Sequence, residues 1–210
     1  MESIDLLIKR YPALSNCRNT LETAVAQLVF CYQQGGKLLV CGNGGSCSDA
    51  AHIVGEMMKS FCLPRKLTPA QTQALSTVHP MGTQMAQQLQ QGFSTIDLSA
   101  QISLNTAISN DVNPSLCFAQ QAFVYAQPCD VLLGISTSGQ SENILKAGVA
   151  AKSKGAYTIG FTGQATCRMD TVFDLVVHAP AIETYQVQEY HLPMYHALCL
   201  DVEQALFSQE

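Results

Sequence analysis

The chain has 210 residues, of which 47% are apolar and 13% charged, and its formal net charge is -5 at pH 7. This size suits a single domain with a sizeable core, and the acidic balance argues against non-specific nucleic-acid or membrane partners. Because no apolar run could span a bilayer and residues 1–5 lack the layout of a signal peptide, we expect a cytoplasmic protein. The small charged fraction predicts that part of the surface is covered in a homo-oligomer.

The first sixty residues predict a helix, a strand and a second helix in turn. Apolar residues recur at helical spacing before a pair of glycines, so we expect residues 1–35 to form a helical extension. Residues 38–41 predict a buried strand. Residues 48–61 then predict a helix, with Ser46 or Ser48 as its N-cap.

Residues 62–93 carry a weaker signal. Pro64, Pro69 and Pro80 interrupt any helical period, and residues 84–91 are rich in glutamine. We expect this segment to be an extended excursion from the domain that contains one short helix.

A regular alternation of strand and helix resumes after the excursion. The patterns predict strands at 95–98, 131–135, 158–161 and 172–177, and helices at 102–109, 142–152 and 183–207. Such alternation is typical of the α/β class, with a parallel sheet, right-handed crossovers and helices on both faces. With no internal repeat in the chain, residues 1–210 are expected to form one domain, whose ligands bind beyond the carboxyl ends of the strands.

Two loops of small residues follow predicted strands. The first contains Asn43, Gly44, Gly45 and Ser46, and the second contains Ser136, Thr137, Ser138 and Ser141. A strand that leads through such a loop into a helix presents unpaired backbone N–H groups, a local positive dipole and hydroxyl donors, which together suit a phosphate. The first loop alone is equally consistent with a tight turn, and it matches neither the P-loop nor the G-x-G-x-x-G pattern.

Titratable side chains gather on two predicted helices, the one after the first loop and the last one. His52 and Glu56 lie four apart on the helix after the first loop, so both face the same way. The last helix carries Gln188 and His196. An ordinary hydrogen bond between His52 and Glu56 explains their spacing, but beside a phosphate site the same groups could transfer protons or bind zinc.

Four segments in order resemble the SIS (sugar isomerase) domain proteins, and within them the phosphoheptose isomerases, which act on sedoheptulose 7-phosphate. The segments are CGNGGS-x-x-D-A-x-H-x-x-x-E from Cys41 to Glu56, the pair Asn110-Asp111, DVLLGISTSGQS over 130–141 and VQEYHLPMYH over 187–196. The similarity extends over residues 21–207, with a poor match over 63–94.

The resemblance implies a three-layer αβα sandwich with a five-stranded parallel sheet, assembled as a homotetramer with active sites between subunits. It implies a substrate-binding set of Asn43, Gly44, Gly45, Ser46, Asn110, Asp111, Ser136, Thr137, Ser138, Ser141 and Gln188. It also implies that Zn²⁺ is bound by His52, Glu56, Gln188 and His196, and that Glu56 and His196 form the acid–base pair.

These assignments lead us to expect an aldose–ketose isomerase that works on a sugar phosphate through an enediol, with sedoheptulose 7-phosphate as substrate. Glu56 would be the base and His196 the acid, with zinc polarising the oxygens. Because Gln188 and His196 are eight residues apart, about 12 Å along an ideal helix, we expect Pro193 to bend the helix or neighbouring subunits to supply the ligands.

Two departures from the family concern the sugar. Tyr185 stands where the heptose enzymes carry an aspartate, and the excursion is longer than theirs. Two other functions remain as alternatives. One is a non-catalytic SIS protein like the one that binds the replication initiator DnaA, which lacks counterparts of Glu56 and His196. The other is a sugar-phosphate sensor, which would need the serine loop but not the acid–base pair.

Overall fold

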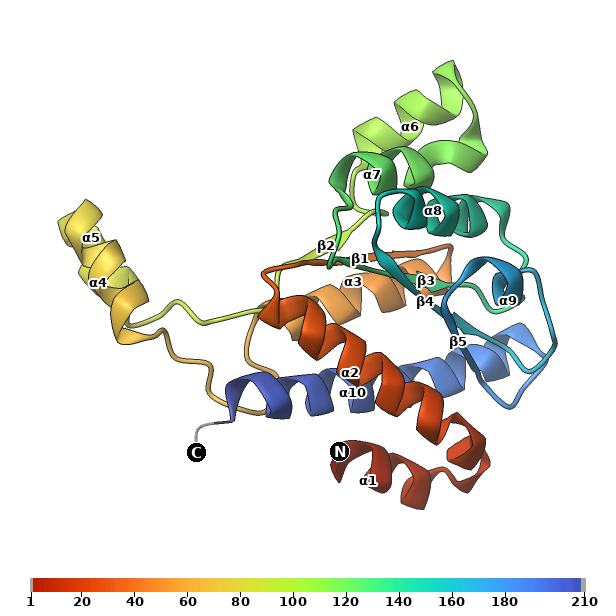
Figure 1. Ribbon diagram of the computed structural model, residues 1–210, viewed down its shortest axis with the longest axis horizontal. Helices are drawn as coiled ribbons and strands as arrows, with labels where there is room; N and C mark the ends of the chain where they lie inside the picture. Colours follow the sequence, from red (N-terminus) through yellow and green to blue (C-terminus); the bar gives the residue numbers. More distant parts are fainter. Residues whose placement is uncertain (1, 209–210) are drawn as a thin grey trace.

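The computed structural model describes residues 2–208, and over these residues five strands form one parallel sheet (Figure 1). The strands are β1 (Leu38–Gly42), β2 (Thr95–Asp97), β3 (Val131–Ile135), β4 (Tyr157–Thr162) and β5 (Leu175–His178), in the spatial order β2-β1-β3-β4-β5. The α/β class and the five-stranded parallel sheet are therefore confirmed. The last strand begins three residues later than predicted, because a short helix, α9 (Met169–Val172), precedes it.

The central strands are apolar along their whole length because the sheet is covered on both faces. Every residue of β1 and of β3 is buried. Leu39 and Cys41 belong to the core on one face, whereas Leu38 and Val40 belong to the core on the other. This continuous apolar pattern is the one that predicted buried parallel strands.

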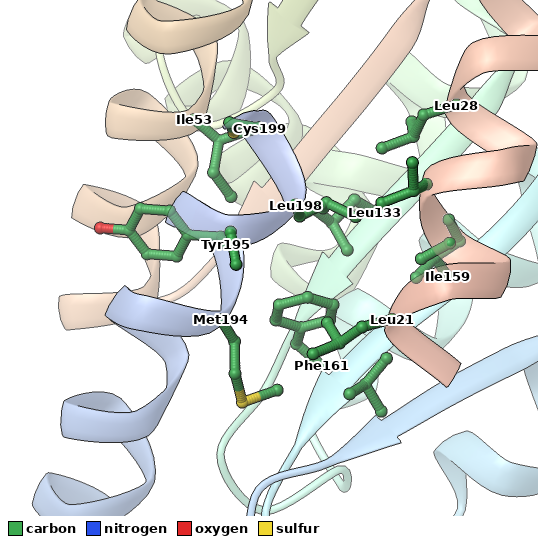
Figure 2. Packing of buried hydrophobic residues seen from close by; sticks show 14 of the residues in the cluster. Leu21, Leu28, Ile53, Leu133, Ile159, Phe161, Met194, Tyr195, Leu198 and Cys199 are labelled. Carbon is green, nitrogen blue, oxygen red and sulfur yellow. The ribbon is translucent and has the colours of Figure 1, made fainter. Parts of the chain in front are cut away.

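One face of the sheet is covered by helices from the two ends of the chain. These are α1 (Glu2–Arg10), the 3-10 helix η1 (Pro12–Cys17), α2 (Arg18–Gln33), α3 (Gly45–Met58) and α10 (Thr184–Phe207). Figure 2 shows their core, a buried cluster that includes Leu21 and Leu28 of α2, Ile53 of α3, Leu198 of α10 and Phe161 of β4. In the predicted helical extension, α2 packs on the sheet, whereas α1 packs on α10 and α2.

The opposite face is covered by helices from the middle of the chain: α6 (Ile102–Asp111), the 3-10 helix η2 (Pro114–Leu116), α7 (Cys117–Tyr125), α8 (Glu142–Ser153) and α9. Together the two helical layers and the sheet form the predicted αβα sandwich. The sequence analysis assigned no element to α7. This helix follows directly from η2, whose first residue is Pro114.

The excursion forms a helical arm and not an extended segment with one helix. It contains α4 (Pro69–Val78) and α5 (Pro80–Met85), which pack on each other and project from the rest of the molecule (Figure 1). The prediction of one helix failed because both prolines occupy first helical positions, where the missing N–H costs nothing. Residues 67–96 contain no Asp, Glu, Lys or Arg, and α4 buries none of its described residues.

Among residues 2–208, no helix is both long enough and apolar enough to cross a bilayer.

Candidate active site

The two small-residue loops lie side by side, at the carboxyl ends of neighbouring strands. In the parallel register of β1 and β3, Gly42 is paired with Ile135, and these are the last residues of the two strands. The chain then continues from β1 into α3 on one face of the sheet, and from β3 into α8 on the other. In a sheet of this order the point between β1 and β3 is the topological switch, where a crevice opens for ligands.

Close backbone packing shapes the glycine loop. A Cβ on Gly42 would lie 2.3 Å from the carbonyl oxygen of Ser46, and Gly44 has a φ of +55° that favours glycine. Gly44 is also the N-cap of α3, and within the described chain no side chain caps this helix. The predicted serine N-cap is therefore wrong. The N–H groups of Ser46 and Cys47 already donate to the carbonyl oxygens of Asn43 and Gly44, so in this first turn the Gly45 N–H is the one that stays available to a ligand.

The serine loop is a tight turn that is stabilised by hydrogen bonds between its own residues. The Ser136 hydroxyl donates to the Ser141 hydroxyl at 2.9 Å, and the Gly139 N–H donates to the Ser136 carbonyl at 3.0 Å. Gly139 has a φ of +62°, and a Cβ there would lie 2.1 Å from the Cys167 sulfur, so another residue would disrupt the turn. The N-cap of α8 is Ser141, whose side chain makes no capping bond, and Asn143 Oδ1 accepts the N–H of Ile144 at 3.0 Å in the first turn.

A cavity of about 290 Å³, here called the loop cavity, lies between the two loops and the first turns of α10. Of the predicted substrate-binding residues it brings together Asn43, Gly44, Gly45, Ser46, Ser136, Thr137, Ser141 and Gln188, and Ile135 and Thr184 complete its lining. No Lys or Arg lines this cavity. An anion there would be bound by backbone N–H groups, hydroxyls and an amide.

Three predicted substrate-binding residues lie outside the loop cavity. The Ser138 hydroxyl is exposed and accepts the Gln140 N–H at 3.2 Å. Asn110 and Asp111 are exposed at the end of α6, where the Asn110 amide donates to the Asp111 carboxylate at 2.7 Å. Their role in binding stays a prediction.

Asn143 connects the two loops, and the sequence analysis missed it. Its side-chain amide donates to Asn43 Oδ1 at 2.8 Å, and the Asn43 amide donates to Asn143 Oδ1 at 2.9 Å. The reciprocal pair fixes the glycine loop to the first turn of α8. The only sequence signal was an amide residue in the first turn after the serine loop.

A second group of predicted site residues meets between α3 and α10, and we call it the imidazole–carboxylate cluster: His52, Glu56 and His196. His52 Nε2 lies 3.2 Å from Glu56 Oε1, and the rings of His52 and His196 meet edge to face with centroids 5.0 Å apart. Lys59 Nζ lies 3.2 Å from Glu56 Oε2. The structure therefore brings both the proposed base and the proposed acid into contact with His52.

His196 is the member of the cluster whose ionisation is most affected by its surroundings. Burial lowers the pKa of His196, the nearby His52 acts in the same direction, and Glu56 opposes them. Its Nε2 atom is buried and has no hydrogen-bond partner among residues 2–208. The imidazole is therefore neutral at neutral pH, with one ring nitrogen uncommitted.

The loop cavity and the cluster occupy opposite ends of one helix pair. Gly45 of α3 packs against Gln188 of α10, since a Cβ on this glycine would lie 2.5 Å from Gln188 Nε2. Seven residues further along each helix, His52 contacts Tyr195. The two helices thus run parallel, and about 10 Å of axial rise separates the contacts.

The four predicted zinc ligands do not converge within one chain. Gln188 lies at the cavity end of the helix pair and the other three lie at the cluster end. Helix α10 continues through Pro193, so the proline does not divide it. Within residues 2–208, no three side chains of His, Cys, Asp or Glu are arranged to hold a metal ion. Supply of a ligand by a neighbouring subunit stays a prediction.

A buried ion pair fixes the cluster end. Arg65 Nε lies 2.8 Å from Glu203 Oε1, and both side chains are 1% exposed. Arg65 also donates to the carbonyl oxygens of Glu56, at 2.9 Å, and Met57, at 2.6 Å, in the last turn of α3. Glu203 additionally accepts the backbone N–H groups of residues 61, 62 and 63. This pair ties the end of α3 to α10.

Comparisons with known proteins agree with this architecture. A family model described as the SIS domain matches residues 92–163. A phosphoheptose isomerase of Burkholderia pseudomallei (strain K96243) is 34% identical over 197 residues, covering 94% of this chain and 85% of the relative. One from Helicobacter pylori (strain P12) is 35% identical, covering 91% and 86%.

The solved structures show the same likeness. The phosphoheptose isomerase GmhA from Neisseria gonorrhoeae superposes with a TM-score of 0.75 at 27% identity, covering 97% of this chain and 94% of that chain. A phosphoheptose isomerase from Francisella tularensis gives 0.73, also at 27% identity, with 97% and 93% covered. The chain therefore belongs to the phosphoheptose isomerase family of SIS-domain proteins.

Proposed function

We propose that this protein is an aldose–ketose isomerase that converts sedoheptulose 7-phosphate into a heptose 7-phosphate through an enediol. The observation that carries the proposal is the contact of His52 with both Glu56 and His196, on the same helix pair that lines the loop cavity. Family membership supplies the reaction class, since the relatives are phosphosugar isomerases by name.

The phosphate would bind in the loop cavity. Backbone N–H groups at the starts of α3 and α8, together with the hydroxyls of Ser136, Thr137 and Ser141, offer donors to a dianion. Because no Lys or Arg holds the phosphate there, the ester can leave after turnover. Asn43 and Gln188 would contact the sugar beside it.

The chemistry would take place at the imidazole–carboxylate cluster. Glu56 would remove the proton from C1 of the ketose while His196 donates a proton to the carbonyl oxygen at C2, which gives the enediol. The C1 hydroxyl then loses its proton and C2 receives one, which gives the aldose. The lowered pKa of His196 favours a neutral imidazole that can donate its N–H and take the proton back.

The spacing of the two ends favours a long substrate. About 10 Å of helix separates the Gly45–Gln188 contact from His52, and six carbon–carbon bonds separate C1 from the phosphate-bearing C7 of a heptose. A sugar phosphate with a shorter chain would leave its reacting carbons nearer the loop cavity than Glu56.

The donor set fits a zinc ion in its chemistry. Imidazole and carboxylate are ligands that Zn²⁺ prefers, and the buried Nε2 of His196 is uncommitted. Within a single chain His52, Glu56 and His196 are not arranged to hold the ion, so we propose that they would hold it only when a neighbouring chain of a homotetramer supplies Gln188. When bound, zinc would polarise the substrate oxygens.

The direct test follows sedoheptulose 7-phosphate by NMR, with zinc present, in D₂O. Aldose formation with deuterium at C2 of the aldose is the expected result. Deuterium exchange without net turnover would retain the proton transfer but reject this sugar. Binding of the ester without any exchange would overturn the proposal and leave a sugar-phosphate sensor.

A further inference from the structure

A second loop lies behind the serine loop and bonds to it at two points. This backing loop, residues 163–168, connects β4 to α9. The Gly163 N–H donates to the Thr137 carbonyl oxygen at 3.0 Å, and the N–H of Met169, the first residue of α9, donates to the Gly139 carbonyl oxygen at 3.2 Å. Because Thr137 lines the loop cavity, the shape of that cavity depends on where the backing loop lies.

His178 connects the two ends of the backing loop. It is the last residue of β5 and is paired in the sheet with Thr162, which precedes the loop. Its Nδ1 lies 2.8 Å from the Gly163 carbonyl oxygen, and its Nε2 lies 2.8 Å from Asp170 Oδ1. The other carboxylate oxygen of Asp170 accepts the Cys167 N–H at 2.8 Å. The imidazole therefore holds the first residue of the loop, and the carboxylate holds its end.

Both neighbours of the His178 ring are hydrogen-bond acceptors. A carbonyl oxygen and an ionised carboxylate can only accept. Burial alone would raise the pKa of Asp170, but the bonds from the Cys167 N–H and from His178 outweigh it and lower this pKa, so the carboxylate is ionised at neutral pH. The two contacts therefore exist together only when both ring nitrogens carry protons. A neutral ring donates to one acceptor and turns a lone pair toward the other.

The other titratable groups around β5 do not replace Asp170 in this contact. The Cys17 thiol donates to the His178 carbonyl oxygen at 3.1 Å, and because burial raises its pKa to about 11, it stays neutral. Arg168 of the backing loop is exposed, and Tyr157 lies at the opposite end of β4. Charged side chains on the elements beside β5 form pairs of their own: Arg18 with Glu22, and Lys152 with Asp174.

We propose that His178 and Asp170 are positioning residues that keep the serine loop in its phosphate-binding shape by fixing the backing loop at both ends. Their effect on the ester rests on the proposed function, whereas the coupling between the two loops does not. Neither residue lines the loop cavity, and neither belongs to the predicted site. Because they act on the shape of the binding site alone, their loss should weaken the binding of substrate and transition state equally.

The first test is His178→Phe, which keeps a planar ring and removes both N–H donors at a side chain that is 32% exposed. The amide protons of Gly163 and Met169 should exchange with solvent faster than in the wild type. The KM for sedoheptulose 7-phosphate should rise about 2- to 30-fold, with kcat nearly unchanged. His79→Phe is the matched control, because His79 contacts only the Met81 N–H in the arm, and it should change neither quantity.

The second test is Asp170→Asn, which changes the donors and acceptors and keeps the shape. The Asn amide can donate to Nε2 of a neutral His178 while its oxygen accepts the Cys167 N–H, so the neutral ring keeps both contacts. NMR locates the pH at which His178 titrates in the wild type, and calorimetry measures the dissociation constant of the ester on either side of it. The ratio of the wild-type constant to the variant constant should rise from the acid to the alkaline side.

The outcomes separate this inference from the proposed function. Unchanged exchange at Gly163 and Met169 in His178→Phe, an unchanged KM, or a ratio of dissociation constants that does not vary with pH would overturn it. A wild-type protein that binds inorganic phosphate but never isomerises sedoheptulose 7-phosphate would reject the proposed substrate. In that protein, a lower affinity for inorganic phosphate in His178→Phe would still uphold the inference.

Discussion

The two ends of the α3–α10 pair are built in different ways. At the cavity end, Gly45 and Gln188 meet beside loops whose small residues are consecutive in the sequence and whose binding groups are backbone N–H and hydroxyls. At the cluster end, side chains from two segments distant in the sequence, α3 and α10, meet, and a buried Arg65–Glu203 pair ties the two helices together. The comparison teaches that the proposed binding and proton-transfer groups lie in separable parts of one helix pair.

The largest expected effect comes from Glu56→Gln at the cluster end. Loss of the base should lower the rate of deuterium exchange about 10²- to 10⁴-fold, while calorimetry should find the affinity for sedoheptulose 7-phosphate nearly unchanged. The reason is that the proposed ester site lies about 10 Å away along the helices. Retained exchange would mean that another group is the base.

Arg65→Met tests what holds the cluster end together. The variant leaves Glu203 charged, buried and without its partner, so the free energy of unfolding should fall by about 3–5 kcal/mol in urea titrations. Arg18→Met is the matched control, because Arg18 pairs with Asp5 at an exposed site and should cost no more than about 1 kcal/mol. Equal losses of unfolding free energy in the two variants would contradict the idea that the buried ion pair matters more than the exposed one.

His191 lies between the two ends and should make stability sensitive to acid. Burial lowers the pKa of His191 to about 4, so the unfolded chain binds a proton that the folded chain refuses. The stabilisation of the folded state by neutral His191 is therefore complete above pH 6.5 and is lost as the pH falls toward 4. Between pH 7 and pH 5 the loss should be about 2 kcal/mol.

The control for this pH effect is His191→Gln, which does not titrate and keeps an amide donor for the Thr162 carbonyl that His191 contacts. The difference in unfolding free energy between wild type and variant should change with pH in that window. A difference that stays constant from pH 7 to pH 5 would show that His191 titrates normally.

Gly45→Ala gives the smallest effect and should act on binding alone. The new Cβ would meet Gln188 Nε2 at 2.5 Å, and because this is the end of a flexible side chain, Gln188 should move into the loop cavity. Affinity for the ester should fall about tenfold, or 1.4 kcal/mol. Gly55→Ala is the control: its Cβ meets nothing within 4 Å, so binding should stay unchanged.

The cavity end was largely predictable from the sequence, because local patterns determine it. Apolar runs gave β1 and β3 within a residue of their bounds, and parallel pairing then required the two following loops to be neighbours. The serine N-cap was wrong because Gly44 adopts a backbone conformation that no side-chain pattern reveals.

The cluster end was only partly predictable. The spacing of His52 and Glu56 was a local signal, but the Arg65–Glu203 pair joins residues 138 positions apart, and nothing near either residue predicts the other. Asn143 acts through hydrogen bonds to a side chain from a distant part of the chain. The arm was misjudged because proline can begin a helix as well as end one.

The uncharged arm has a practical consequence for protein chemistry. After Lys66 the next basic residue is Lys146, so trypsin would release everything between them as one fragment and could not cut at α4 or α5. Val78 and Met81, which are 86% and 61% exposed, mark the junction of these helices. Thermolysin, which cleaves beside apolar side chains, is a protease that should cut the chain at this junction.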